Sequence, residues 1–228
     1  EISRLSTVQF TSLGGVGEVG ANSYLVEIGG LRILIDCGIH PKKEGFPSLP
    51  EFSVLNAAPD AVIISHAHID HCGSLPYLLK LYPTVTPYAT MPTLKIMDRM
   101  LHNSVSVMGI LRDERSIPEY PLYEHADVDF ALRKAYGIEM YNTFGIHPDS
   151  ELRVTFTPAG HVLGAGSILL STPDHTVFYT GDICTIDQEL MRKFEVPSDI
   201  HDIDTLIIES TYGANENADS YSYKEEIR

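Results

Sequence analysis

The chain has 228 residues, of which 43% are hydrophobic, and it carries a formal net charge of −15 at pH 7. This length and composition favour a domain with a packed apolar core and argue against a largely disordered chain. The negative charge argues against simple electrostatic attraction to nucleic acid or to anionic membranes.

No apolar run approaches the roughly 18 residues of a membrane-spanning helix, and the first residues lack a signal-peptide pattern. We therefore expect a cytoplasmic protein with no membrane partner. Three cysteines, Cys37, Cys72 and Cys184, are too few and too odd in number for a secreted disulfide framework, so we expect reduced thiols.

The first half of the chain predicts strands followed by helices. Residues 6–13 and the pair of β-rich runs at 22–28 and 31–36 read as strands, and Gly29 and Gly30 between the last two predict a hairpin. A short buried strand at 61–65 is followed by helical spacing of apolar residues at 73–82.

The second half continues with a strand, two helices and four further strands. We expect a strand at 85–90, a helix at 92–108 that begins with proline, and a helix at 125–137 closed by Gly137. The four strand-like runs are 152–161, 165–172, 175–182 and 204–211. The predicted fold class is α/β in the broad α+β sense, with helices between groups of strands.

Residues 15–20, GVGEVG, match the G-x-G-x-x-G pattern of dinucleotide-binding sites. That site needs a helix directly after the glycines, so that the helix N-terminus faces the pyrophosphate. Here a β-hairpin is predicted instead. We therefore interpret the glycines as a turn that lets the backbone approach a neighbouring site.

Residues 66–71, HAHIDH, place three histidines and an aspartate directly after the strand at 61–65. His66 and His68 project from the same side of extended chain, whereas Asp70 and His71 follow where the backbone bends into a helix. Imidazole and carboxylate are ligands that Zn²⁺ accepts, so the motif predicts two neighbouring metal pockets. The alternative is a polar loop that caps the helix, but capping needs one oxygen and no imidazoles.

Six residues cannot enclose two ions, so we expect further ligands at the ends of other strands. His161 follows one strand among small residues, and Asp182 follows another. Taken singly, His161 could be a buried structural histidine and Asp182 a turn-forming carboxylate. Together with HAHIDH they close a site that otherwise lacks ligands.

These motifs resemble those of the metallo-β-lactamase fold: HAHIDH, AGHVLGAGS at 159–167, TGD at 180–182 and IDCG at 35–38. ESTYG at 209–213 and the opening GGVGEVGANSYLVE resemble more narrowly the β-CASP branch, whose members are RNA-processing nucleases. That branch includes the cleavage and polyadenylation endonuclease and ribonuclease J. The resemblance spans essentially the whole chain.

The resemblance implies two zinc ions, with manganese as the alternative metal. It implies that the first zinc is held by His66, His68 and His161, that the second is held by Asp70 and His71, and that Asp182 bridges them. Asp70 would also accept a hydrogen bond from the attacking water. Asp36 would orient a ligand histidine, and Glu209 would support the site through hydrogen bonds. The alternative for Asp36 and Glu209 is a structural acid at the end of a strand.

The resemblance also implies a domain organisation. Residues 1–213 would be the N-terminal part of a metallo-β-lactamase-type αββα sandwich, incomplete in this chain, and residues 214–228 would begin an inserted β-CASP domain. The proton-donor histidine and a further histidine on the second zinc would then lie outside the chain.

The implied function is zinc-dependent hydrolysis of RNA phosphodiester bonds, with RNA as the substrate and a homodimer or a processing complex as possible assemblies. One alternative is a hydrolase of a small ester, thioester or lactam on the same fold, which the acidic charge would suit. Another is a non-catalytic partner subunit, against which the intact ligand set argues.

The remaining histidines are expected on the surface or in the core. They are His40, His102, His125, His147, His175 and His201. His40, near the glycine turn, has a minor alternative as a substrate contact. Cys72, beside His71, is expected as a small packed thiol rather than a metal ligand.

Overall fold

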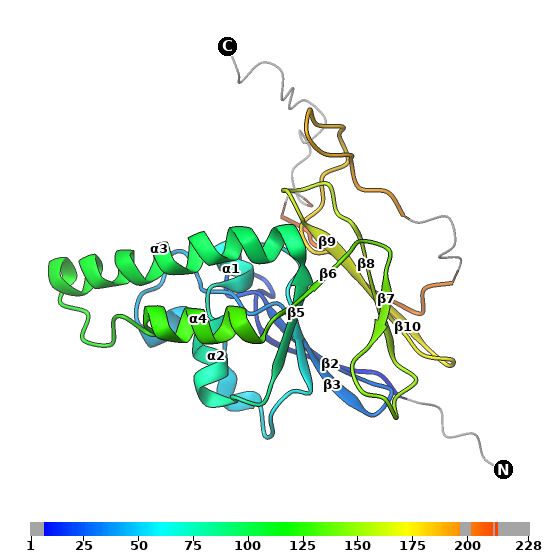
Figure 1. Cartoon of the computed structure of the whole chain (residues 1–228), viewed down its shortest axis with the longest axis horizontal. Coiled ribbons are helices and arrows are strands. Elements are labelled where there is room, and N and C mark those ends of the chain that lie inside the picture. The colour runs from blue at the N-terminus through cyan, green and yellow to red at the C-terminus, as the bar shows by residue number, and fades with distance from the viewer. Residues whose placement is uncertain (1–6, 197–201, 212, 214–228) are drawn as a thin grey trace.

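Two mixed β-sheets pack face to face, and four helices lie against the outer face of the first sheet (Figure 1). The computed structural model describes residues 7–196, 202–211 and 213. Residues 214–228, predicted to begin a second domain, and Tyr212 of the ESTYG motif lie outside the described residues.

The first sheet has six strands in chain order. They are β1 Gln9–Gly14, β2 Ser23–Ile28, β3 Leu31–Ile35, β4 Ala61–Ile63, β5 Thr86–Thr90 and β6 Tyr136–Ile138. The first three strands are antiparallel, and β3 to β6 are parallel.

The second sheet has five strands in the order β11-β10-β9-β8-β7. They are β7 Thr143–Gly145, β8 Arg153–Pro158, β9 Gly166–Ser171, β10 Thr176–Tyr179 and β11 Thr205–Ile207. All pairs are antiparallel except β10 with β11, so β8, β10 and β11 run in the same direction.

The α-helices are α1 Ile69–Cys72, α2 Leu75–Leu81, α3 Met91–Arg115 and α4 His125–Lys134, with short 3-10 turns at Phe46–Ser48 and Phe52–Val54. The Thr90 side chain caps α3 by accepting a hydrogen bond from the backbone N–H of Thr93, and α4 begins with a capping box between Glu124 and Asp127.

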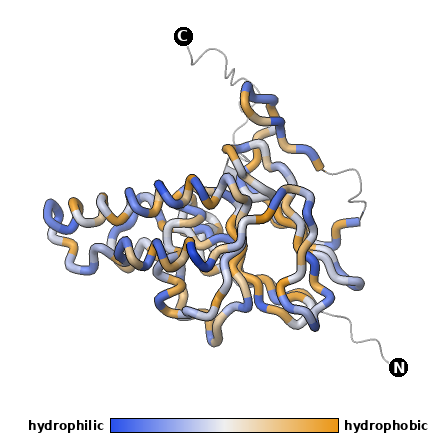
Figure 2. The backbone as a smooth tube through the Cα atoms, viewed as in Figure 1, coloured by the Kyte–Doolittle hydropathy of each residue, from blue (hydrophilic) through white to orange (hydrophobic). Residues whose placement is uncertain are grey.

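Two apolar layers hold these elements together. Leu34 on β3 and Val62 on β4 face the helices, whereas Ile33, Ile35 and Ile63 face the second sheet. Parallel strands covered on both faces are apolar on both, as these are. Figure 2 shows the hydrophobic residues gathered in the strands, with hydrophilic and hydrophobic residues alternating along α3 and α4.

Most predicted elements are confirmed, with three differences. Helix α3 continues seven residues beyond the predicted end, to Arg115, and neither β6 nor β7 was predicted. Gly137 does not close α4. It lies in β6, where a Cβ atom would be 2.5 Å from the Met91 side chain, so its small size serves packing.

The predicted sandwich of two sheets with helices is confirmed. In the part of the chain that the structure describes, helices cover only the outer face of the first sheet. None of the described helices combines the length and apolar character needed to span a bilayer.

Candidate metal centre

The candidate ligands lie where strands of both sheets end. His66 follows β4, His161 follows β8, Asp182 follows β10, and α1 carries Asp70 and His71. Because β3 and β4 are parallel, and β8, β10 and β11 share a direction, the carboxyl ends of these strands meet at one edge of each sheet. The two edges together form the site.

A first group joins His66, His68, His161 and Asp182, whose nearest nitrogen and oxygen atoms all lie within 4.8 Å of one another. His68 Nδ1 is 3.1 Å from His66 Nε2 and 3.2 Å from His161 Nε2. Tetrahedral zinc with bonds near 2.1 Å has ligand atoms about 3.4 Å apart. The spacing of these four side chains therefore fits a single metal ion.

A second group joins Asp70 and His71 to the same Asp182. His71 Nε2 is 3.3 Å from Asp182 Oδ1 and 3.7 Å from Asp70 Oδ2. The other oxygen of Asp182 faces the first group, 3.8 Å from His66 Nε2 and 3.6 Å from His161 Nε2. Asp182 thus presents one oxygen to each group.

The protonation states of the histidines in the first group favour binding of a cation. Burial lowers the pKa of His66 far below its usual range, and it also lowers the pKa of His161, in both cases despite the nearby Asp182 carboxylate. At neutral pH these imidazoles are therefore uncharged and offer lone pairs to a shared point.

His71 behaves in the opposite way. Burial would lower its pKa, but the Asp36 and Asp182 carboxylates outweigh that effect and raise the pKa to about 10. Burial would raise the pKa of Asp182, but hydrogen bonding and attraction to His71 hold it well below its usual range. Carboxylates that stabilise a proton on His71 Nε2 would equally stabilise a metal cation there.

The Asp36 carboxylate fixes the orientation of the His71 ring. The carboxylate is fully buried and accepts hydrogen bonds from the backbone N–H and hydroxyl of Ser65, at 2.7 and 2.8 Å, and from the Tyr179 hydroxyl at 2.7 Å. His71 Nδ1 lies 2.8 Å from the same carboxylate. The contact directs Nε2 of the ring toward Asp182.

Asn22 and Tyr24 approach the second group from β2 and the loop before it. The Asn22 amide donates to the backbone carbonyl of Asp70 at 3.1 Å and lies 3.0 Å from His71 Nε2. The Tyr24 hydroxyl in turn donates to the Asn22 side-chain oxygen at 3.0 Å. These contacts hold Asp70 and His71 on the first sheet.

Backbone contacts place α1 against the turn after β3. Cys37 N–H donates to the His71 carbonyl at 2.7 Å, and Ile39 N–H donates to the Ile69 carbonyl at 2.9 Å. Gly38 lies between them, and a Cβ atom there would be 1.7 Å from the Asp70 carbonyl oxygen. Only glycine permits this approach of backbone to backbone.

Two further contacts position the loops that carry His161 and Asp182. The hydroxyls of Thr90 and Thr93, at the start of α3, donate to the carbonyl of Gly164 at 2.6 and 3.0 Å. Glu209 accepts a hydrogen bond from the backbone N–H of Ile183 at 3.1 Å.

A cavity of about 490 Å³ opens beside the second group. Asp70, His71, Asp182 and Glu209 form one side, and the glycine loop 15–19 forms another. The loop is a turn followed by β2, which confirms that it is not the start of a dinucleotide-binding helix. Asp36 does not reach the cavity, so it would act through His71.

The minor alternatives in the sequence concern His40 and Cys72. His40 is buried and its Nε2 lies 3.3 Å from the Glu18 carboxylate, on the glycine loop. Cys72 is the last residue of α1 and is fully buried, as expected for a packed thiol, and all three cysteines are free. The sequence analysis assigned no role to Asn22, Tyr24 and Tyr179. Asn22 and Tyr24 lie within the opening GGVGEVGANSYLVE and Tyr179 directly precedes TGD, but those motifs do not show which of their side chains contact the ligands.

The model of the Metallo-beta-lactamase superfamily matches residues 16–223. The chain belongs to this superfamily. Among curated metallo-β-lactamase relatives, "Endoribonuclease YSH1" of Gibberella zeae is 34% identical over 90% of this chain and 24% of its own length. "Transcription termination factor FttA" of Cenarchaeum symbiosum is 32% identical over 95% of this chain and 33% of its own length.

"Cleavage and polyadenylation specificity factor subunit 3" of Dictyostelium discoideum is 33% identical over 90% of the chain and 26% of its own length. The chain thus spans about a quarter to a third of these relatives, and its resemblance to the β-CASP branch is confirmed. A "Protein of Unknown Function" from Enterococcus faecalis V583 shares the metallo-β-lactamase fold, with a TM-score of 0.55 at 24% identity over 79% of this chain and 44% of that one.

Proposed function

We propose that this metallo-β-lactamase domain hydrolyses RNA phosphodiester bonds at a two-metal site. The observation that carries the proposal is the convergence of two His/Asp groups on Asp182 beside an open cavity, in a chain related to endoribonucleases over nine-tenths of its length. The proposed ligands are His66, His68 and His161 for the first ion, Asp70 and His71 for the second, and Asp182 for both.

Divalent ions in such a site lower the pKa of a bound water and stabilise the negative charge that develops on a phosphoryl group. Zinc fits the imidazole-rich first group, and manganese is the alternative for the second, which is richer in carboxylate. Asp70, about one-quarter exposed at the cavity wall, is placed to accept a proton from an attacking water. Asp36 and Asn22 hold His71 and Asp70 in that position.

The test is cleavage of an end-labelled single-stranded RNA by the zinc-loaded protein, with Asp70→Asn and Asp182→Asn as inactive controls. We expect product with the full-length protein that contains the unchanged chain. We expect at least a 100-fold loss in both variants, because Asp70→Asn removes the positioned proton acceptor and Asp182→Asn removes the carboxylate shared by the two groups. Absence of cleavage by protein that holds two ions would refute the proposal.

A second candidate is hydrolysis of a small neutral ester, thioester or lactam. The cavity favours it in one respect, since the described residues that line it include Glu18, Asp70, Asp182 and Glu209 but neither lysine nor arginine. An acidic wall repels a polyanion unless bound metal compensates. Turnover of a chromogenic lactam or thioester by protein that leaves RNA intact would favour this candidate.

A further inference from the structure

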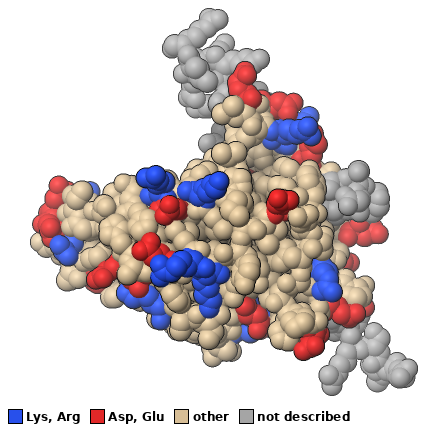
Figure 3. Space-filling view, viewed as in Figure 1, with Lys and Arg blue, Asp and Glu red and all other residues tan. Residues whose placement is uncertain are grey.

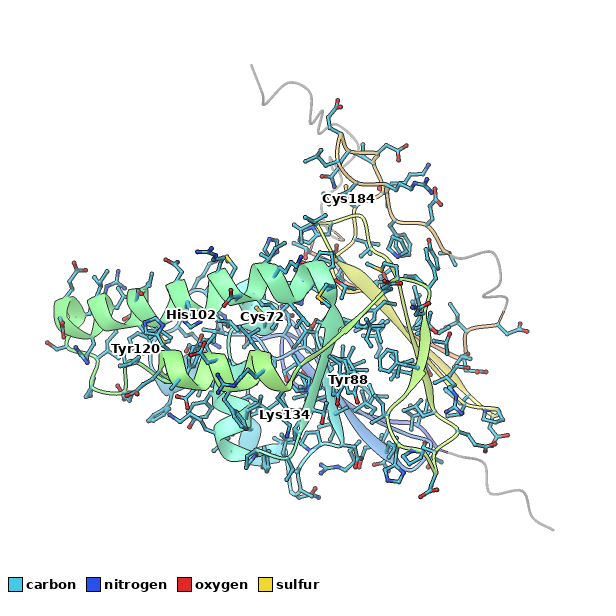
Figure 4. The ribbon with its side chains drawn as sticks, viewed as in Figure 1. Cys72, Tyr88, His102, Tyr120, Lys134 and Cys184 are labelled. Atoms are coloured by element: carbon cyan, nitrogen blue, oxygen red, sulfur yellow. The ribbon has the colours of Figure 1, made fainter. Side chains whose placement is uncertain are left out.

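Another cluster of histidine and aspartate side chains lies outside the candidate metal centre, where α3 and α4 face each other. Asp98 and His102 are four residues apart on α3, and His125 and Asp129 are four residues apart on α4. Residues at this spacing share one face of a helix. His102, labelled in Figure 4, points from α3 toward α4, where it meets both partners.

Both aspartates of the cluster lie close to Nε2 of His102. This nitrogen is 3.5 Å from Asp98 Oδ1 on its own helix and 3.4 Å from Asp129 Oδ1 on α4. Ligand atoms around tetrahedral zinc are about 3.4 Å apart. Among the described residues only His66, His68, His161 and Asp182 already converge on one point, so the two carboxylates here must move to share an ion with His102. The Asp98 and Asp129 side chains are 52% and 54% exposed, which leaves each free to rotate.

The other ring nitrogen of His102 has a partner suited to a metal ligand. His102 Nδ1 lies 2.7 Å from His125 Nδ1, and the two rings stack with centroids 5.0 Å apart. When Nε2 binds a metal, the ring proton is on Nδ1, and this N–H group can donate a hydrogen bond to Nδ1 of His125. Metal-bound histidines usually have such a hydrogen-bond acceptor, which fixes the ring.

A groove gives access to the cluster. It has a volume of about 350 Å³, and its lining includes Asp98 and Asp129 together with Lys95 and Arg133. Figure 3 shows basic side chains gathered over α3 and α4 with acidic ones among them. Lys95 and Arg133 would repel a bound cation, but the negative charges of Asp98 and Asp129 offset their charges. The charge of a bound divalent ion would be screened, because solvent and counterions reach the groove.

We propose that Asp98, His102 and Asp129 form a surface site for a divalent transition metal such as Zn²⁺, with His125 orienting His102. The site is separate from the candidate centre and does not depend on the proposed function. An ion bound at this site would link α3 to α4. The competing interpretation is an ion-pair network, in which protonated His102 bridges the carboxylates without any metal.

The experiment measures the number of zinc ions bound per chain, by elemental analysis of the protein after equilibrium dialysis at micromolar free zinc. To remove the contribution of both ions of the candidate centre, the triple variant His66→Ala/His71→Ala/Asp182→Asn serves as a background beside the unchanged chain, since it removes one histidine from each group and the carboxylate that the two groups share. We expect His102→Gln to bind one ion fewer per chain than its parent in both backgrounds. His147→Ala, which removes another exposed histidine, is the matched control and should bind as many ions as its parent.

A second readout guards against loss of folding. Far-UV circular dichroism should be unchanged in His102→Gln, and Co²⁺ should give visible ligand-field bands in the background variant that disappear with His102→Gln. Equal zinc counts in His102→Gln and its parent would overturn the proposal and leave the ion-pair network. Equal losses in His102→Gln and His147→Ala would also overturn it, as binding by an adventitious ion only.

Discussion

At the scale of single residues, the candidate centre depends on a carboxylate, Asp36, that does not line the cavity. Asp36 is fully buried, yet it receives hydrogen bonds from Ser65 and Tyr179 and contacts His71 at 2.8 Å. A buried carboxylate with this many partners is already stabilised by neutral donors. Its charge can therefore be directed at His71 without a large cost of burial.

We predict that Asp36→Asn weakens metal binding to the Asp70–His71 group by about 10- to 100-fold, because the ring loses the negatively charged acceptor that orients it. Tyr179→Phe removes one neutral hydrogen bond and should have a smaller effect in the same direction. Calorimetric titration with zinc measures both. Tyr136→Phe, at an exposed strand edge, is the control, and an Asp36→Asn affinity equal to that of the control would contradict the assigned role.

The cysteines offer a separate residue-scale prediction. Burial raises the pKa of Cys37 to about 12 and raises that of Cys72 well above its usual range, so neither forms an appreciable thiolate at pH 8. Cys184 is half-buried. Titration of native protein with a thiol reagent should therefore detect one fast-reacting thiol, and denatured protein should show three. Fast reaction of Cys37 or Cys72 would show that α1 opens readily.

At the scale of elements, strong periodicity predicted most of the strands and both long helices. The short strands β6 and β7 were missed, because they form by pairing with β5 and β8, which no local pattern records. The same distinction applies to the site. The candidate ligands could be predicted from dense motifs, whereas Asn22, Tyr24 and Tyr179 gain their contacts from packing between distant strands.

The turn between β3 and α1 provides the element-scale prediction. Gly38→Ala would bring a Cβ atom to 1.7 Å from the Asp70 carbonyl, so the turn and α1 must separate. We expect destabilisation of about 1–3 kcal/mol, as for other overpacked sites, and weaker metal binding by Asp70 and His71. Urea denaturation measures the first effect.

Gly109→Ala is the matched control for that substitution. Gly109 lies within α3, and a Cβ atom there would meet nothing within 4 Å. Alanine is favoured over glycine in a helix interior by about 1 kcal/mol, so this variant should be more stable than the parent. Destabilisation by both substitutions to the same degree would contradict the steric explanation for Gly38.

At the scale of the whole molecule, the candidate ligands come from both sheets. His66 and His71 belong to the first sheet and its helices, and His161 and Asp182 to the second. The facing layers between the sheets are apolar and include Ile33, Val154 and Phe156 in full burial. An ion bound to His66, His161 and Asp182 would therefore link the two sheets at the edge where their apolar contact ends.

Removal of metal should consequently lower the stability of the whole fold. An ion that binds only the folded state adds about 2.7 kcal/mol at a free concentration 100 times its dissociation constant. We expect Tm to rise with zinc and to fall after chelation, and Asp182→Asn to lose most of that dependence because it contributes an oxygen to each group. His102→Gln separates the contribution of the α3–α4 cluster and should retain most of the dependence. If Tm did not change with zinc while dialysed protein still held the ions, the metal would bind without joining the sheets, and the stability of the fold would rest on the apolar layers alone.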